Sequence, residues 1–303
     1  MSVILFINSV QKNCGCHDYG ERTFRILENS VPYNFIYKEP NNLEEYNALK
    51  EGIKPEAVIH NYHPLTMAWL PPFEPTSKTV NMLLHHEGTE LNLKPDYWLY
   101  VDSLHSETGN KFAIPRPLVE WSLHWKPINI IPVISSFGMG FGNKNYGLIT
   151  KTVNEQFDEA ILRFHIPRAY YGDRNGESTA GILPGIYNEM QNPNIHLEIT
   201  HDFLSEDELL QWLAESSLNV FLYEQMEGRG LSSVIDYALS VDVPIAINDS
   251  AMFRHIQNPI SNVANNSLKY IIAAGTDHLK VYKQKWSNEN FLRKYESILN
   301  ETL

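Results

Sequence analysis

Residues 219–249, NVFLYEQMEGRGLSSVIDYALSVDVPIAIND, decide the fold class of this chain. Apolar runs of strand length stand at both ends of the stretch. Between them lie a polar loop with two glycines and a segment whose apolar residues recur at helical spacing. A strand, a loop, a helix and a second strand in this order predict a parallel α/β unit. Ligands of open α/β sheets bind where strands run into helices. The loop at 227–233 is therefore the first candidate site.

The N-terminal third of the chain repeats this alternation. Continuous apolar runs rather than alternating ones predict strands that are buried on both faces, as in a parallel sheet covered by helices. Asp18 with Glu21 three residues later resembles a helix N-cap pair. We expect strands at 2–7, 34–40, 55–62, 79–88 and 96–103, and helices at 21–30 and 42–52.

A proline-rich stretch without clear periodicity, residues 113–132, divides the chain. After it the α/β alternation restarts, and Ser205 with Glu208 forms a capping box that predicts a helix start. We expect a Rossmann-like domain at 1–124, a second at 128–285, and a final helix at 286–303 that packs back on the first domain. The elements expected in the second half are strands at 129–138, 159–167 and 195–203, and helices at 145–157, 205–217 and 288–303.

Composition excludes several classes of protein. The chain has 303 residues and a formal net charge of -12, so its surface repels nucleic-acid phosphates and anionic lipid. Cys14 and Cys16 are the two cysteines, and a one-residue spacing does not favour a relaxed disulfide. The first apolar run is too short to span a bilayer and lacks a basic flank. We expect a cytoplasmic protein with no transmembrane segment and no nucleic-acid partner.

The loop at 227–233 combines residue types that bind a phosphorylated sugar. Two glycines before a helix allow close backbone approach, and free amides at a helix start attract anions. Arginine offers a fork of donors to phosphate, serines add hydroxyl donors, and a carboxylate suits sugar hydroxyls. The plainer alternative is a glycine turn with a serine cap. The residues concerned are Glu227, Gly228, Arg229, Gly230, Leu231, Ser232 and Ser233.

This stretch resembles the C-terminal half of the GT-B glycosyltransferases, in particular the retaining GT4-like group. Residues 227–231 fit the Glu-Gly-x-Gly-Leu motif of that group, and Pro244 with Ile245 fits its later Pro-Val/Ile strand. The group places a second acid eight residues after the first, to hold the nucleotide ribose. Here Asp236 lies nine residues after Glu227, and Tyr237 takes the second acidic position when counted back from Pro244. The resemblance implies two Rossmann-like domains that face each other across a central cleft.

A second loop, SSFGMGFGNKNYG at 135–147, carries the resemblance further. Lys144 matches the basic residue that binds the donor diphosphate in the family. The partner arginine of the family is missing, and Arg229 or Arg163 is a substitute. In the first domain, the resemblance implies Gly15, together with His17 and Gly20, near the donor phosphates.

The same resemblance places a histidine next to the reacting sugar. His85 or His86 fills that position and would orient the sugar or stabilise charge in a retaining reaction. If the reaction instead inverts the anomeric centre, His86 or Glu87 is the candidate base, because a side chain must then accept the acceptor proton.

The resemblance implies an enzyme that transfers a sugar from a nucleotide-diphosphate sugar to a hydroxyl of a carbohydrate, lipid carrier or small molecule, with retention. Lys144, Arg229 and residues 230–233 would bind the diphosphate, with Asp236 also at the donor, and Glu227 the sugar. No cofactor is expected, and no Asp-x-Asp tripeptide suggests a bound cation. The alternatives are a nucleotide-sugar epimerase or hydrolase of the same fold, and an inactive binding module.

A metal site is a further alternative for the histidine-rich loops. Imidazole and carboxylate groups are common metal ligands. The spacing of these residues fits no known ligand template, however. The group consists of His60, His63, His85, His86 and Glu87.

Overall fold

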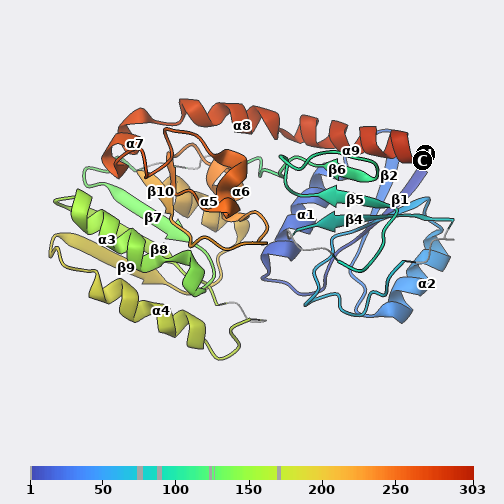
Figure 1. Ribbon diagram of the computed structural model, residues 1–303, viewed down its shortest axis with the longest axis horizontal. Coiled ribbons are helices and arrows are strands. Elements are labelled where there is room, and N and C mark those ends of the chain that lie inside the picture. Colours follow the sequence, from blue (N-terminus) through green and yellow to red (C-terminus); the bar gives the residue numbers. More distant parts are fainter. Residues whose placement is uncertain (1, 74–77, 87–90, 123–124, 126, 169–171) are drawn as a thin grey trace. The chain divides into compact units, whose positions relative to one another are not determined.

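A computed structural model describes residues 2–73, 78–86, 91–122, 125, 127–168 and 172–303. The chain forms two compact units (Figure 1). The first contains residues 1–118, 228–231 and 285–303, and the second contains residues 119–227 and 232–284. Within the described part of the chain, no helix combines the length and the apolar character needed to cross a membrane.

The first unit is built on a parallel sheet with the strand order β2-β1-β3-β4-β5-β6. Each expected strand is confirmed within a few residues. The edge strand β6 was not predicted, because it has three residues and ends where the proline-rich stretch begins. The strands are β1 (Ser2–Ile7), β2 (Tyr33–Lys38), β3 (Ala57–His60), β4 (Val80–His85), β5 (Tyr97–Tyr100) and β6 (Lys111–Ala113).

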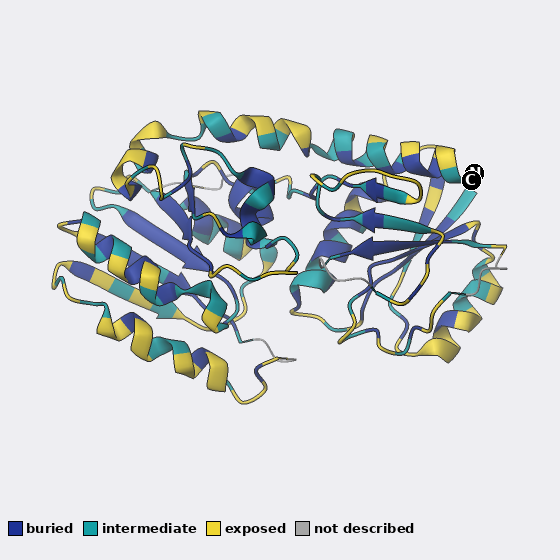
Figure 2. Cartoon of the chain, viewed as in Figure 1, coloured by how far each residue is buried: buried dark blue, intermediate teal, exposed yellow. Residues whose placement is uncertain are grey.

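Both faces of this sheet are buried, as the continuous apolar runs predict (Figure 2). Ile4 and Phe6 of β1 point into a core that includes helix α1 (Gly15–Leu27). Leu5 and Ile7 point into the opposite core, together with Tyr46 of helix α2 (Leu43–Ile53). Alternate residues of one strand therefore fill two separate cores.

The last helix of the chain, α9 (Asn288–Thr302), completes the first of these cores. Its contacts with the sequence around β2 are also polar. Ser30 Oγ donates to Glu296 Oε1 at 2.7 Å, and Tyr33 OH donates to Asn300 Oδ1 at 2.7 Å. The side chains that α9 buries in the core are those of Phe291, Tyr295, Ile298 and Leu299.

The second unit is built on a parallel sheet with the strand order β11-β10-β7-β8-β9. Its helices are α3 (Tyr146–Gln156), α4 (Glu177–Asn188), α5 (Glu206–Ala214), α6 (Val234–Ser240), α7 (Leu268–Ala274) and α8 (Lys280–Lys285). Three short 3-10 segments, η1 (Gly142–Lys144), η2 (Ala251–Ile256) and η3 (Asp277–Leu279), connect them. The strands are β7 (Val133–Phe137), β8 (Ala160–His165), β9 (Ile195–Thr200), β10 (Leu218–Phe221) and β11 (Ile245–Ile247).

Of the two helix N-caps expected from the sequence, the structure confirms one and contradicts the other. The capping box at the start of α5 is confirmed: Ser205 Oγ accepts from the Glu208 backbone amide, and the Glu208 carboxylate accepts from that of Ser205. The N-cap expected at Asp18 is wrong. Helix α1 begins at Gly15 with Cys14 as its N-cap, so Asp18 lies inside the first turn.

Candidate functional site

Each sheet has a point at which the strand order changes direction, and the candidate loops follow the strands at these points. In the first unit β1 pairs with both β2 and β3. In the second unit β7 pairs with both β8 and β10. Crevices for ligands form beyond the carboxyl ends of strands at such switch points. The loops after β1, β3, β7 and β10 are thus where the topology favours binding.

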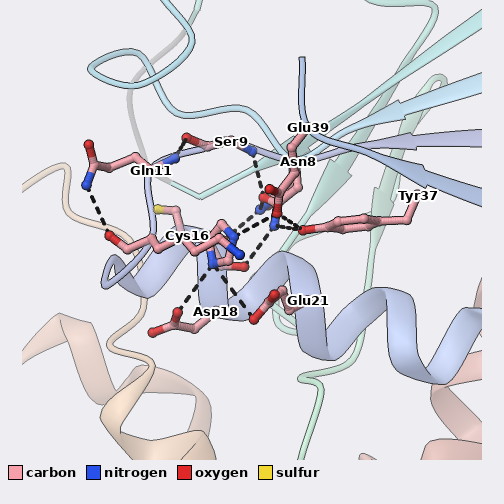
Figure 3. Close-up of polar contacts among 11 residues, drawn as sticks. Asn8, Ser9, Gln11, Cys16, Asp18, Glu21, Tyr37 and Glu39 are labelled. Atoms are coloured by element: carbon pink, nitrogen blue, oxygen red, sulfur yellow. Dashed lines mark hydrogen bonds and ion pairs between the residues drawn. The ribbon is translucent and has the colours of Figure 1, made fainter. Parts of the chain in front are cut away.

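Two asparagines connect the loops at the switch point of the first unit. Asn8 follows β1 and Asn61 follows β3, and Asn61 Nδ2 donates to Asn8 Oδ1 at 2.7 Å. Asn61 Nδ2 also donates to the Cys16 carbonyl at 2.6 Å, and Asn8 Nδ2 donates to the His17 carbonyl at 3.0 Å. These backbone carbonyls can only accept, so they fix the orientation of both amides. The first turn of α1 is therefore held against the ends of two strands (Figure 3).

This network determines the tautomer of His86, one of the two histidines expected next to the sugar. Asn61 Nδ2 is used as a donor, so its Oδ1 accepts from His86 Nε2 at 2.5 Å. Burial lowers the pKa of His86 to about 3, and the charge of Arg116 lowers it as well. At neutral pH the ring is uncharged and carries its proton on Nε2. The ring also stacks edge-on against Tyr19, with centroids 4.8 Å apart.

His85, the other candidate, lies in an aromatic group on the sheet. It is 5% exposed, and its ring packs against Trp98 and Tyr100 with centroids 5.4 and 4.9 Å away. Of the two histidines, His86 is thus the one that the Asn8–Asn61 network holds. Gly15, the predicted phosphate contact of this unit, is the first residue of α1 and is partly exposed.

Gly20 lets α1 approach the asparagine pair, and its replacement provides a test of the network. A Cβ at Gly20 would lie 2.4 Å from Asn61 Nδ2 and 2.6 Å from Asn8 Oδ1. We expect Gly20→Ala to lower the free energy of unfolding by about 1–3 kcal/mol, because overpacking displaces both amides. Denaturant unfolding measures the change.

Gly52→Ala is the matched control, since nothing lies within 4 Å of a Cβ at this helical glycine. We expect it to leave stability unchanged or raise it by up to about 1 kcal/mol. Equal stability of the two variants would contradict the close packing at Gly20.

In the second unit, Lys144 lies where the switch-point loops meet. Gly138 directly follows β7 and has φ +147°, a conformation that only glycine adopts readily. A Cβ there would be 3.4–3.5 Å from Tyr146 OH, Lys144 Cε and Tyr223 OH, so three side chains converge on this glycine. Lys144 Nζ lies 3.9 Å from the centroid of the Tyr223 ring, in a cation–π contact. Tyr223 belongs to the loop after β10.

Backbone contacts join the same two loops. The Glu224 amide donates to the Asn143 carbonyl at 2.9 Å. Ser232, also predicted at the donor, is buried, and its amide donates to the Met252 carbonyl at 3.1 Å. Its hydroxyl is the neighbour that lowers the pKa of the Tyr223 phenol, although burial raises that pKa more strongly. Lys144 thus contacts the Tyr223 ring, and the hydroxyl of Ser232, predicted from a separate motif, is close enough to influence the pKa of the same residue.

The remaining predicted donor residues differ in exposure. Glu227 is exposed in the loop after β10, and Gly228 has φ +69°. Arg229 is exposed, whereas Gly230 and Leu231 are partly exposed. Helix α6 begins at Val234, with Ser233 as its N-cap.

Asp236, the residue at the altered acidic position, is fully buried in α6. Its backbone carbonyl accepts from Ser240 Oγ at 2.7 Å. A ribose contact by its carboxylate stays a prediction.

One histidine of the alternative metal site, His60, lies in the core of the first unit. His60 is fully buried, with Nε2 2.9 Å from Tyr46 OH and Nδ1 3.1 Å from the Met82 carbonyl. Both ring nitrogens therefore have protein partners. Glu87, a member of the same alternative and a candidate base, lies outside the described residues.

Sequence reasoning missed three residues of these loops: Asn8, Asn61 and Tyr223. A signal was available for the asparagines, since each is a polar residue directly after an apolar strand. Nothing in the local sequence distinguishes Tyr223, whose contact with Lys144 spans 79 positions.

Comparison with known proteins identifies the fold. No protein-family model and no curated protein sequence matches the chain. Among solved structures, Anabaena HepE aligns over 99% of this chain and 100% of its own, with a TM-score of 0.68 and 8% identity. The fold is GT-B.

Two other glycosyltransferases also align with this GT-B chain over almost their full lengths. One, from Rickettsia africae, covers 99% of this chain and 98% of its own, with a TM-score of 0.66 and 11% identity. The other is AviGT4, involved in avilamycin A biosynthesis, which covers 100% and 98% with a TM-score of 0.65 and 12% identity. The GT-B architecture expected from residues 227–231 and 244–245 is thus confirmed.

Proposed function

We propose that this protein is a glycosyltransferase that moves a sugar from a nucleotide-diphosphate sugar to a hydroxyl acceptor with retention. The observation that carries the proposal is the cation–π contact of Lys144 with Tyr223, at the switch point of the second sheet. The loop after β7 there supplies a cation, and the loop after β10, which carries Tyr223, continues into the predicted donor residues 227–233. HepE, which shares the fold, has been solved with UDP-glucose and with UDP and glucose, which favours a UDP-sugar donor.

The roles of the residues follow from their chemistry. Lys144, Arg229 and the backbone and hydroxyls of 230–233 bind the diphosphate, whose oxygens gain negative charge as the bond to the sugar breaks. Gly15 allows the close approach of the phosphates in the first unit. Glu227 accepts hydrogen bonds from sugar hydroxyls, and Asp236 belongs to the nucleotide end of the donor. The protein supplies this charge stabilisation without a cofactor.

His86 orients the sugar rather than removing a proton. Its pKa of about 3 makes it a poor base at neutral pH, because a base works best when its pKa lies near the operating pH. A fixed neutral ring with its proton on Nε2 is suited to accept one directed hydrogen bond at Nδ1. This supports retention, in which the enzyme need not supply a base for the acceptor.

Ligand-induced stabilisation tests the donor assignment first. A ligand that binds only the folded state raises the free energy of unfolding by mass action, by about 2.7 kcal/mol at a ligand concentration of about 100 times Kd. The melting temperature rises as a result. We expect a rise in Tm with UDP and UDP-glucose, and a smaller rise or none with CMP, which lacks the second phosphate.

Product analysis then separates the reactions. Release of UDP with a new glycosidic bond supports transfer, whereas free sugar or an epimerised donor points to the alternative enzymes. Absence of any Tm change with UDP, GDP and ADP would contradict a donor site.

A further inference from the structure

The first two turns of α1 bring together the side chains of His17, Asp18 and Glu21, to which the proposed sugar transfer assigns no step. His17 Nδ1 lies 3.5 Å from Asp18 Oδ1 and 3.8 Å from Glu21 Oε2. These three ligand atoms all lie within 4.8 Å of one another. Figure 3 shows the Asp18 and Glu21 carboxylates turned toward the same point beside the helix. An imidazole nitrogen and two carboxylate oxygens in this spacing are a metal-ligand set.

The other nitrogen of the His17 ring is held by a carboxylate. His17 Nε2 lies 2.9 Å from Glu39 Oε1, and that oxygen also accepts from Tyr37 OH at 2.6 Å. Ligating histidines in metal sites usually donate their second N–H to a carboxylate, which fixes the ring and raises its basicity. Glu39 is therefore placed to orient the ring of His17. The other ring nitrogen, His17 Nδ1, faces Asp18 and Glu21.

His17 Nδ1 is a buried polar atom, and buried polar atoms normally have a hydrogen-bond partner or a bound ion. The side chain is 2% exposed, and Nδ1 has no hydrogen bond within the described part of the chain. With Nε2 donating to Glu39, Nδ1 offers either a lone pair or a proton toward two carboxylates. A lone pair facing two anions is repulsive unless a cation lies between them.

We propose that His17, Asp18 and Glu21 bind a divalent transition-metal ion of the zinc class, with Glu39 as the residue that orients the imidazole. Zinc bonds of about 2.0–2.2 Å to nitrogen and oxygen separate two tetrahedral ligands by about 3.3 Å. The separations of 3.5 and 3.8 Å from His17 Nδ1 need to contract by only a few tenths of an ångström, while the two carboxylate oxygens, which lie within 4.8 Å of each other, would also have to move closer together. Three protein ligands leave a fourth position for water.

The metal ion would act as a clamp on the first turn of α1, which carries Gly15 and packs against Asn8 and Asn61. The site goes beyond the proposed transferase, because binding of the ion needs neither donor nor acceptor. Its competitor is a protonated His17 that pairs with the carboxylates. Burial lowers the pKa of this imidazole, but Asp18, Glu39 and Glu21 together raise it above its ordinary value.

The zinc content of the protein distinguishes a metal site from a protonated His17 that pairs with the carboxylates. The full chain is stripped with a chelator, dialysed against Zn²⁺ and analysed for bound zinc, and its Tm is measured with and without the ion. We expect one more equivalent of zinc in the wild type than in His17→Gln or Glu21→Gln, and a zinc-dependent rise in Tm that both variants lose. Glu39→Gln should keep the site with an affinity about 10–100-fold lower.

His196→Gln is the matched control, since His196 and Glu198 form an exposed pair at the same 3.5 Å separation in the second unit. It should bind as much zinc as the wild type. Equal zinc content in wild type and Glu21→Gln would overturn the proposal, as would a wild type that binds no zinc. The Glu21 side chain is 40% exposed, so this variant decides the question even if His17→Gln does not fold.

Discussion

Replacing Glu227 by glutamine is expected to lower the rate of sugar transfer by about 100-fold and to leave the melting temperature unchanged. Hydrogen bonds to a charged acceptor contribute about 1.5–3 kcal/mol, and the amide keeps the shape of the side chain while removing its charge. Glu227 is exposed in the loop after β10, so the substitution leaves the folded core intact. Steady-state kinetics with a UDP-sugar donor, together with a melting curve, measure both effects.

Glu224 provides the control for this prediction because it is an exposed acid in the same loop. The loop is anchored there by the backbone of Glu224, whose amide bonds to Asn143 and whose carbonyl accepts from Ser250. Glu224→Gln should therefore keep most of the transfer rate. An equal loss in both variants would show that the negative charge of the loop matters and not the Glu227 carboxylate.

Replacing Lys144 by methionine is expected to weaken UDP binding by about 10–100-fold. The substitution removes the ammonium group, and a charge-assisted hydrogen bond to phosphate contributes about 1.5–3 kcal/mol. Methionine retains an apolar side chain that packs on the Tyr223 ring. Calorimetry with UDP measures the change in Kd, and the rate at saturating donor should fall less than the affinity.

Lys151→Met on α3 is the matched control, because Lys151 is an exposed lysine of the same helical region. UDP should bind this variant as tightly as the wild type. If Lys144→Met also binds UDP normally, Lys144 does not contact the diphosphate, and the donor assignment would then rest on residues 227–233.

Most strands and several helices were predictable because their signals are local. The run from Ser2 to Ile7 is apolar at every buried position, and the structure places it in the sheet interior. Ser205 and Glu208 mark the start of α5 within four residues. Such features are fixed by a few consecutive side chains, so tertiary contacts do not overrule them.

Helix α4 escaped prediction because its sequence contains residues that normally interrupt helices. Pro184 lies in its interior, where it removes a backbone donor. Gly181 and Gly185 lower its helix propensity further. The structure shows a use for Gly147 of α3: a Cβ there would lie 3.1 Å from the Gly185 carbonyl oxygen, so α3 approaches the backbone of α4 closely at this glycine. Packing between helices here outweighs local propensity.

The candidate site was predictable only as a set of loops. Parallel strands place their carboxyl ends at one edge, which is why residues 135–147 and 227–233 were selected. The contacts within the loops depend on long-range pairing. His17 meets Glu39 because β1 pairs with β2, and Asn8 meets Asn61 because β1 pairs with β3. No local pattern contains these pairs.

The position of α9 in the core of the first unit has a consequence for synthesis on the ribosome. Residues 119–227 and 232–284 lie between the first strand and the helix that completes its core. The N-terminal sheet is made first, yet Phe291 and Leu299, which fill one of its faces, emerge last. The core on this face of the sheet, which α1 covers in part, therefore stays incomplete until nearly the whole chain has been translated. The second unit, made almost without interruption, is free to fold before the first is finished. In nascent chains that stop before Asn288, we therefore expect protease to cut the N-terminal part of the first unit more readily than the second unit.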